Sequence, residues 1–144
     1  MKQHIKPRLL WLVLIGILLA ACQEPTATDL TSQFFEQQQK YEEVYQIIYD
    51  AISTSPPSLP PTTELIKELG IRSMYWSGEC NIYFMPFQSR KNGIGVKKGF
   101  AALCEPPTEL VDDIDQVGDR QGFYVVYQHL ADNWYLFREV YPTP

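Results

Sequence analysis

The sequence predicts an α+β domain, in which a long N-terminal helix and short helices pack on a mostly antiparallel sheet of about five strands. Three observations support this prediction: an early apolar repeat of helical period, five later segments rich in aromatic and β-branched residues, and turn residues between neighbouring segments. Short turns between strands favour antiparallel pairing. About 120 residues follow the first apolar run, which is the length of one ordinary domain rather than two.

Residues 29–52 are predicted to form the long helix, with Asp29 as its N-cap. At about 100° per residue, its apolar side chains fall within about 120° of one another. These are Leu30, Phe34, Tyr41, Val44, Tyr45, Ile48, Ala51 and Ile52. The other side of the helix is rich in Gln and Glu, which does not suit a helix lying on lipid headgroups. We therefore expect the apolar stripe to pack on the domain's own sheet.

The proline-rich residues 55–61 end this helix, because proline lacks the amide hydrogen that a helix interior needs. A short second helix is expected to follow, with Thr62 or Thr63 as its cap and Leu69 near its end. Gly70 stops this helix, since glycine readily adopts the left-handed conformation found after a helix.

Residues 71–76 and 79–87 are predicted to pair as a hairpin around Ser77-Gly78. Pro86 places the end of the second strand at a sheet edge or at a bulge, because proline cannot donate to a ladder of hydrogen bonds. A loop is expected at residues 89–93, before the chain returns as a third strand.

The third strand is predicted over residues 94–104, broken or bulged at Gly95 and Gly99. Pro106-Pro107-Thr108 then opens a further short helix that reaches Val117. The expected inward side chains of this helix are Leu110, Val111, Ile114 and Val117.

The chain closes with an aromatic hairpin, residues 123–128 and 134–141, around a turn at Ala131-Asp132-Asn133. Bulky side chains occupy both faces of these strands, which predicts either two buried faces or one exposed adhesive face. Trp76, Trp134 and Tyr135 are the candidate residues of a binding surface.

The N-terminal segment begins with the basic residues Lys2, Lys6 and Arg8, followed by an apolar run over residues 9–21. This run is too short to remain as a membrane span, which needs about 20 apolar residues. Basic residues, a short apolar core and small residues before a cleavage point are typical of a secretory signal. A plain cleavable signal peptide is therefore one interpretation.

Leu19-Ala20-Ala21-Cys22 resembles the lipobox of bacterial lipoproteins, in which the cysteine is acylated and becomes the mature N-terminus. The resemblance implies that residues 1–21 are a lipoprotein signal peptide, that residues 22–28 are the acylated cysteine and a short tether, and that residues 29–144 are a single domain. In this family an aspartate after the cysteine favours the inner membrane, and this chain has Gln23 there. The resemblance therefore implies anchoring through acyl chains on Cys22 to the periplasmic face of the outer membrane.

The charge of the chain limits the kinds of partner that the domain can bind. Removal of the signal peptide leaves nine basic and seventeen acidic residues, a formal charge of −8. An acidic domain repels nucleic acid and anionic lipid headgroups at the range of a Debye length. We therefore exclude nucleic acid as a partner and retain the membrane, reached through the acyl chains, and an envelope protein.

Cys80 and Cys104 are the remaining cysteines, and an oxidising compartment favours their pairing. Cys80 alternates with Ile82 and Phe84 on one strand face, as Cys104 alternates with Ala102 and Phe100 on another. Antiparallel pairing brings these faces into register, so a Cys80–Cys104 disulfide is predicted. A reactive redox pair is disfavoured, because such pairs are usually spaced Cys-x-x-Cys.

No catalytic residue is assigned. His129 is the one histidine after Cys22, and it is accompanied by no nucleophile elbow, although Asp132 and one of Ser73, Ser77 or Ser89 would complete a triad with it in principle. With the two cysteines paired, too few ligands remain for zinc. We expect no enzyme activity and no cofactor.

The acidic run 112–119 matches a calcium loop at Asp113, Asp115 and Gly118 but places Val117 and Tyr124 where oxygen ligands are needed. A solvated acidic helix face is the simpler interpretation, and no metal is assigned.

The one basic cluster after the signal comprises Arg90, Lys91, Lys97 and Lys98. Its two interpretations are a site for an acidic partner and a charged edge strand that resists aggregation.

Taken as a whole, these observations predict a non-enzymatic binding or accessory protein anchored to the cell envelope. One alternative is a small inhibitor or immunity-type protein that acts against an envelope hydrolase. The alternative from another class is a hydrolase that uses carboxylates or His129.

Overall fold

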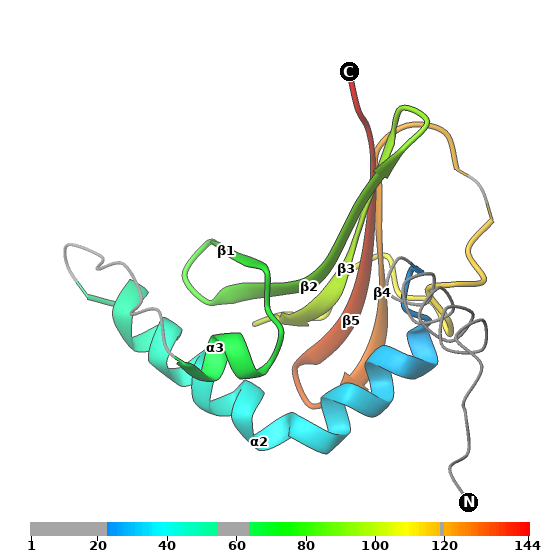
Figure 1. Cartoon of the computed structure of the whole chain (residues 1–144). Helices are drawn as coiled ribbons and strands as arrows, with labels where there is room; N and C mark the ends of the chain where they lie inside the picture. The colour runs from blue at the N-terminus through cyan, green and yellow to red at the C-terminus, as the bar shows by residue number, and fades with distance from the viewer. Residues whose placement is uncertain (1–22, 55–63, 119) are drawn as a thin grey trace, which may run out of the picture.

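The computed structural model describes residues 23–54, 64–118 and 120–144, which form one five-stranded antiparallel sheet with a long helix on one face (Figure 1). The order of the strands in the sheet is β1-β2-β3-β5-β4. The elements are α2 (Ala27–Ile52), α3 (Glu64–Glu68), β1 (Ser73–Ser77), β2 (Asn81–Lys91), β3 (Ile94–Ala102), β4 (Tyr124–Ala131) and β5 (Trp134–Pro142). The α+β class is confirmed. No helix in these ranges is long and apolar enough to cross a membrane.

Helix α2 begins two residues before the predicted start, and Thr26 rather than Asp29 is its N-cap. The Thr26 hydroxyl accepts a hydrogen bond from the Asp29 amide, and the Asp29 carboxylate accepts one from the Thr26 amide, both at 3.1 Å. This reciprocal pair is a capping box, in which an acid at the third position works with the cap. The prediction of Asp29 as the cap was wrong because the acidic partner of the box was taken for the cap itself.

The apolar stripe of α2 faces the sheet as predicted, and the helix is kinked at Gln37, where φ is −126°. Aromatic rings fill the space between helix and sheet. Phe34 lies 5.6 Å from Phe100 and 5.3 Å from Trp134 between ring centroids, and Tyr41 lies 4.8 Å from Phe100. These four side chains are almost entirely buried, so each contributes about 2–3 kcal/mol of apolar burial to this core.

The β1–β2 hairpin forms as predicted, and Pro86 lies in a bulge between β2 and β3 rather than at the end of β2. β2 continues to Lys91, and its link to β3 is the two-residue turn Asn92-Gly93 with φ of 54° and 76°. The predicted loop at residues 89–93 was therefore too long. Asn-Gly is the preferred pair for a turn with two positive φ angles, and its twist matches the adjoining strands.

β3 is continuous through Gly95 and Gly99, whereas the sequence predicted a break or bulge at these glycines. Gly99 lies under the bulge of β2, where a side chain would meet the carbonyl oxygen of Phe84 and the ring of Pro86. The glycine allows the bulged strand to approach the backbone of β3 closely.

Residues 106–118 contain no helix, which corrects the prediction of a short helix there and leaves α3 as the short helix of the described residues. The segment instead lies along the edge of β4. The Val111 amide donates to the Tyr127 carbonyl at 2.8 Å, and the Tyr127 amide donates to the Glu109 carbonyl at 2.9 Å. Because these backbone groups satisfy the open edge of the sheet, they are unavailable for helical hydrogen bonds.

The C-terminal hairpin forms as predicted, with Asp132 in its turn at a φ of 47°. β5 lies between β3 and β4, so the more aromatic strand of the hairpin is paired on both sides rather than at the sheet edge. Its side chains alternate between the two faces: Trp134 and Leu136 pack against α2, and Tyr135 and Phe137 point away from it.

Candidate functional site

The face of the sheet turned away from α2, called the outer face below, is apolar and aromatic although no helix of the described residues covers it. Its buried members are Tyr83, Met85, Ala101, Leu103, Tyr135 and Phe137, with Tyr75 and Tyr127 packed against them. These rings bury one another: Tyr75 stacks on Tyr83 at 4.4 Å between centroids, and Phe137 meets Tyr83 edge to face at 5.5 Å. The sequence predicted either two buried sheet faces or one exposed adhesive face, and the structure has aromatic side chains buried on both faces.

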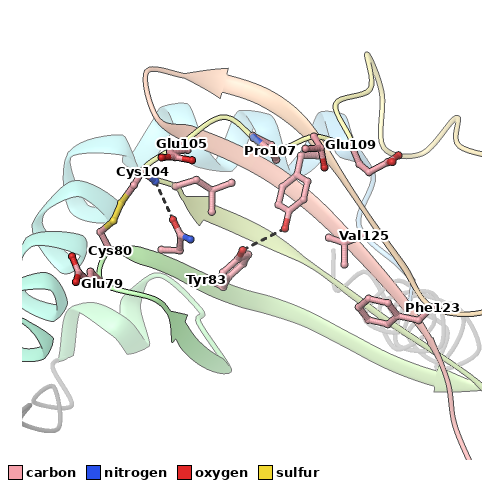
Figure 2. A pocket seen from close by; sticks show the side chains of 13 residues that line it. Glu79, Cys80, Tyr83, Cys104, Glu105, Pro107, Glu109, Phe123 and Val125 are labelled. Atoms are coloured by element: carbon pink, nitrogen blue, oxygen red, sulfur yellow. Dashed lines mark hydrogen bonds between the residues drawn. A yellow bond between two sulfur atoms is a disulfide. The ribbon is translucent and has the colours of Figure 1, made fainter.

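A hollow of about 610 Å³ opens on the outer face, between the strands and the segment that follows β3 (Figure 2). Tyr83, Val125 and Tyr127 belong to its sheet side, whereas Pro107 and Glu109 belong to the segment that crosses it. Phe123 stands at one end with 65 % of its surface exposed, the largest value among the exposed large hydrophobic side chains of the described residues. A volume of this size is in the range of ordinary ligand sites.

The segment over the hollow is fixed at both ends. At one end Cys104 is disulfide-bonded to Cys80, with Cα atoms 6.0 Å apart, and its amide donates to Oδ1 of Asn81 at 3.0 Å. At the other end Glu109 is hydrogen-bonded to β4 through its carbonyl oxygen. The hollow is therefore held open by covalent and backbone bonds rather than by flexible side chains.

The disulfide confirms the pairing predicted from the sequence, and it does so through the register that was expected. Ile82 is opposite Ala102 and Phe84 is opposite Phe100 in the β2–β3 ladder. The same register places Cys80 opposite Cys104, just beyond the last ladder pair.

Two tyrosine hydroxyls meet inside the hollow. The oxygens of Tyr83 and Tyr127 are 3.4 Å apart, and the dashed line at Tyr83 in Figure 2 marks this contact. Burial raises the pKa of Tyr127, and the neighbouring hydroxyl of Tyr83 raises it further. The raised pKa of Tyr75 has burial as its main cause and the nearby charge of Glu139 as a further cause. A raised pKa keeps the phenols of Tyr127 and Tyr75 neutral at physiological pH, so these two side chains supply hydrogen bonds and aromatic faces rather than charge.

The charged residues that line the hollow are all acidic. Glu79, Glu105 and Glu109 line it, and none of its thirteen lining residues is Lys, Arg or His. Glu109 forms an exposed ion pair with Arg120 at 3.2 Å. Glu79 and Glu105 form no ion pair within the described part of the chain.

The basic cluster predicted from the sequence is divided between two environments. Arg90 and Lys91 are exposed at the end of β2, whereas Lys97 and Lys98 form ion pairs on β3, which is an interior strand and not an edge strand. Lys97 pairs with Glu139 at 2.6 Å, and Lys98 is only 3 % exposed, beneath the start of α2. The Lys98 ammonium lies 2.5 Å from Asp115 and 2.8 Å from Glu24.

These contacts also involve the backbone before α2. Lys98 donates to the Pro25 carbonyl at 3.0 Å, and the Ala27 amide donates to Asp115 at 2.6 Å. Part of the predicted tether, from Glu24 onward, is therefore packed on the sheet. Asp115 is an ion-pair partner here and not a member of a calcium loop, and no group of three or more potential metal ligands occurs among residues 23–54, 64–118 and 120–144.

Of the three candidate residues for a binding surface, Trp76 is the exposed one, whereas Trp134 and Tyr135 are buried. Trp134 is 3 % exposed within the core against α2, and Tyr135 is 5 % exposed on the outer face. Trp76 is 38 % exposed on β1, at the sheet margin, where it pairs with Ile82. Alternation showed which side chains share a face, but it did not show which face other parts of the chain would cover.

The other sequence-derived residues are placed as follows. His129 is exposed on β4, with its Nε2 3.0 Å from the Asp132 carbonyl oxygen and its ring against Tyr135, and none of its hydrogen bonds involves a serine. Cys22 and the predicted N-terminal signal lie outside the described residues.

The hollow itself was missed by sequence reasoning, although one signal for it existed. Each disulfide cysteine is followed or preceded by a glutamate, Glu79-Cys80 and Cys104-Glu105, so the predicted bridge already implied two neighbouring carboxylates. Comparison of the chain with protein-family models, curated proteins and solved structures gives no match.

Proposed function

We propose that this chain is a lipid-anchored protein of the cell envelope that binds a partner without catalysing a reaction, and that the partner occupies the hollow on the outer face. The observation that carries the proposal is a preformed concave site with aromatic walls and an exposed phenylalanine, Phe123, at its end. Exposed aromatic side chains beside a rigid pocket are typical anchors of binding sites.

A binding role fits the chemistry of the site better than catalysis does. The hollow is lined by neutral phenols and by carboxylates on its rim, and His129 is not among its lining residues. The hydrolase alternative needs a nucleophile or two convergent carboxylates with a water between them. The inhibitor or immunity-type protein is the second candidate, because an acidic rim suits a basic hydrolase as the partner.

Anchoring is proposed from the lipobox resemblance of Leu19-Ala20-Ala21-Cys22. Glu24 lies two residues beyond Cys22 and pairs with the buried Lys98. Two residues span at most about 7 Å, so an acylated Cys22 brings this end of the domain directly to the bilayer surface. Several acyl chains make such anchoring durable, since each buried methylene contributes about 0.8 kcal/mol.

Site-specific photo-crosslinking tests the binding proposal in intact cells. A photoreactive phenylalanine analogue replaces Phe123 in one variant and Phe35, which is 50 % exposed on α2, in the matched control. We expect a discrete adduct from position 123 and none of the same mass from position 35. Equal adducts at both positions, or none at position 123, would refute binding at the hollow.

Cys22→Ser tests the anchor. We expect the variant to accumulate as unprocessed precursor, because acylation and cleavage both need this thiol, and the fractionated wild-type protein to sediment with outer membranes. A variant that is cleaved and anchored as before would show that the chain is not a lipoprotein.

A further inference from the structure

We infer that the hollow binds a cationic side chain, lysine or arginine, from a basic segment of a protein partner. This inference rests on the proposed function and names the ligand chemistry of the same site. Three features converge on it: the charge of the rim, the covalent fixing of two carboxylates, and the character of the walls.

The rim attracts cations. Glu79, Glu105 and Glu109 contribute three carboxylates, and Arg120 pairs with Glu109 from outside the lining. Two carboxylates remain without a counter-ion in the described part of the chain. In a chain that carries a formal charge of −8 after removal of the signal, this rim steers basic rather than acidic partners to the site.

The disulfide joins the two strand ends that carry the unpaired carboxylates. Glu79 precedes Cys80 and Glu105 follows Cys104, and the two cysteine Cα atoms are 6.0 Å apart. The bridge therefore keeps together the two strand ends that carry these glutamates. A cation bound at this end of the hollow is attracted by both carboxylates.

The walls suit an ammonium or guanidinium group as well. Tyr83 is about nine-tenths buried, and its hydroxyl is hydrogen-bonded to the hydroxyl of Tyr127. Because each hydroxyl has two acceptor lone pairs, the pair can still accept a hydrogen bond from a ligand N–H. The faces of Tyr and Phe rings attract cations within about 6 Å. The same chain uses this interaction elsewhere, with Lys97 4.9 Å from the ring centroid of Tyr141.

The hollow is larger than one side chain requires, which leaves room for the neighbouring residues of a bound peptide. Val125 and Phe123 lie at one end of the hollow, and Glu79 and Glu105 lie at the other (Figure 2). A basic segment can therefore place apolar groups at one end and its cationic side chain at the other. A neutral glycan is the rival ligand, because aromatic rings also stack on sugars, but a glycan makes no use of the uncompensated charge.

Binding of a fluorescent hexalysine peptide to the full chain in a non-ionic detergent tests the inference, with hexa-arginine as the second cationic probe. Glu79→Gln/Glu105→Gln should weaken binding about tenfold at low ionic strength, because each carboxylate attracts a nearby cation through water. Glu36→Gln/Glu43→Gln removes the same charge from the exposed side of α2 and should change the affinity less than twofold. Tyr127→Phe should weaken binding further without changing the net charge.

Equal losses in the two double variants would show non-specific attraction and overturn the inference. Binding of a neutral chito-oligosaccharide in place of the cationic peptides would also overturn it. The failure of this inference can be told apart from failure of the proposed function. If a partner crosslinks at position 123 and the double variant Glu79→Gln/Glu105→Gln captures it equally well, the binding site stands and the cationic ligand is refuted.

Discussion

Asp115 is expected to be the most sensitive acidic residue of the domain for stability. Its carboxylate pairs with the buried Lys98 ammonium at 2.5 Å and accepts the Ala27 amide at 2.6 Å, so it joins β3 to the start of α2. Replacement by alanine leaves Lys98, which is 3 % exposed, with Glu24 as its remaining carboxylate partner.

The magnitude follows from these contacts. At an effective dielectric constant near 20, one close charge pair is worth about 4 kcal/mol, and water that enters the vacated space recovers about half of it. The unpaired Ala27 amide costs about 1 kcal/mol. Asp115→Ala should therefore lower the free energy of unfolding by about 3 kcal/mol, which is at the lower end for a broken buried pair because Lys98 is buried and Asp115 is partly exposed. Asp115→Asn keeps an acceptor for the amide and should cost about 2 kcal/mol.

Urea unfolding followed by circular dichroism at pH 7 measures this loss, and the thermal midpoint should fall by about 12 °C in Asp115→Ala. Asp112→Ala is the matched control, because Asp112 is an exposed aspartate of the same segment. Ordinary surface substitutions change the free energy of unfolding by about 0.5 kcal/mol or less. A loss below about 0.5 kcal/mol in Asp115→Ala, or equal losses in the two variants, would refute the assignment of Lys98 as a buried cation that depends on Asp115.

The same pair predicts a dependence on pH. Burial alone would raise the pKa of Asp115, but the hydrogen bonds from Lys98 and Ala27 and the charges of Lys98 and Arg138 hold it below its usual value. A carboxyl group with a lowered pKa in the folded state stabilises the fold above its unfolded pKa and loses that contribution as the pH falls. The difference in stability between wild type and Asp115→Asn should therefore shrink as the pH falls below about 4.

Two further substitutions test the sheet. The double variant Cys80→Ser/Cys104→Ser opens a loop that the disulfide closes over a sequence separation of 24 residues. It should lower the free energy of unfolding, measured with urea, by about 3.5 kcal/mol. An unchanged stability would show that the bridge does not constrain the unfolded chain. Gly99→Ala should cost about 3 kcal/mol, because the new methyl group meets the backbone carbonyl of Phe84, whereas Gly118→Ala, with no atom within 4 Å of the new group, should stay within about 0.5 kcal/mol. Equal stability of the two alanine variants would contradict the close approach of β2 and β3.

Local patterns in the sequence predicted most of the fold because they depend on neighbouring residues alone. The apolar period of residues 29–52 identified the face of α2, and the alternation around Cys80 and Cys104 identified the register of β2 and β3. The errors were local as well. The pair Asn92-Gly93 specified a two-residue turn that was interpreted as a loop, and the capping box at Thr26 was assigned to its acidic member.

Residues 106–118 show where local pattern fails. Their apolar spacing fits a helix, but the edge of β4 offers hydrogen bonds that the segment takes instead. A sequence pattern reports which side chains can share a face, whereas the choice between helix and edge strand depends on an open sheet edge about twenty residues away.

The sequence by itself determined the secondary structure of the long elements, the cysteine pairing and the acidic character of the chain, because period, count and charge are properties of the chain alone. Only the tertiary structure decided which side chains are buried and which charges meet. It buried Trp134 and Tyr135, brought Lys98 to Glu24 across more than seventy residues, and gathered Tyr83, Tyr127 and two glutamates around one hollow. Burial and long-range pairing depend on which surfaces pack together, and that information arises only when the whole chain has folded.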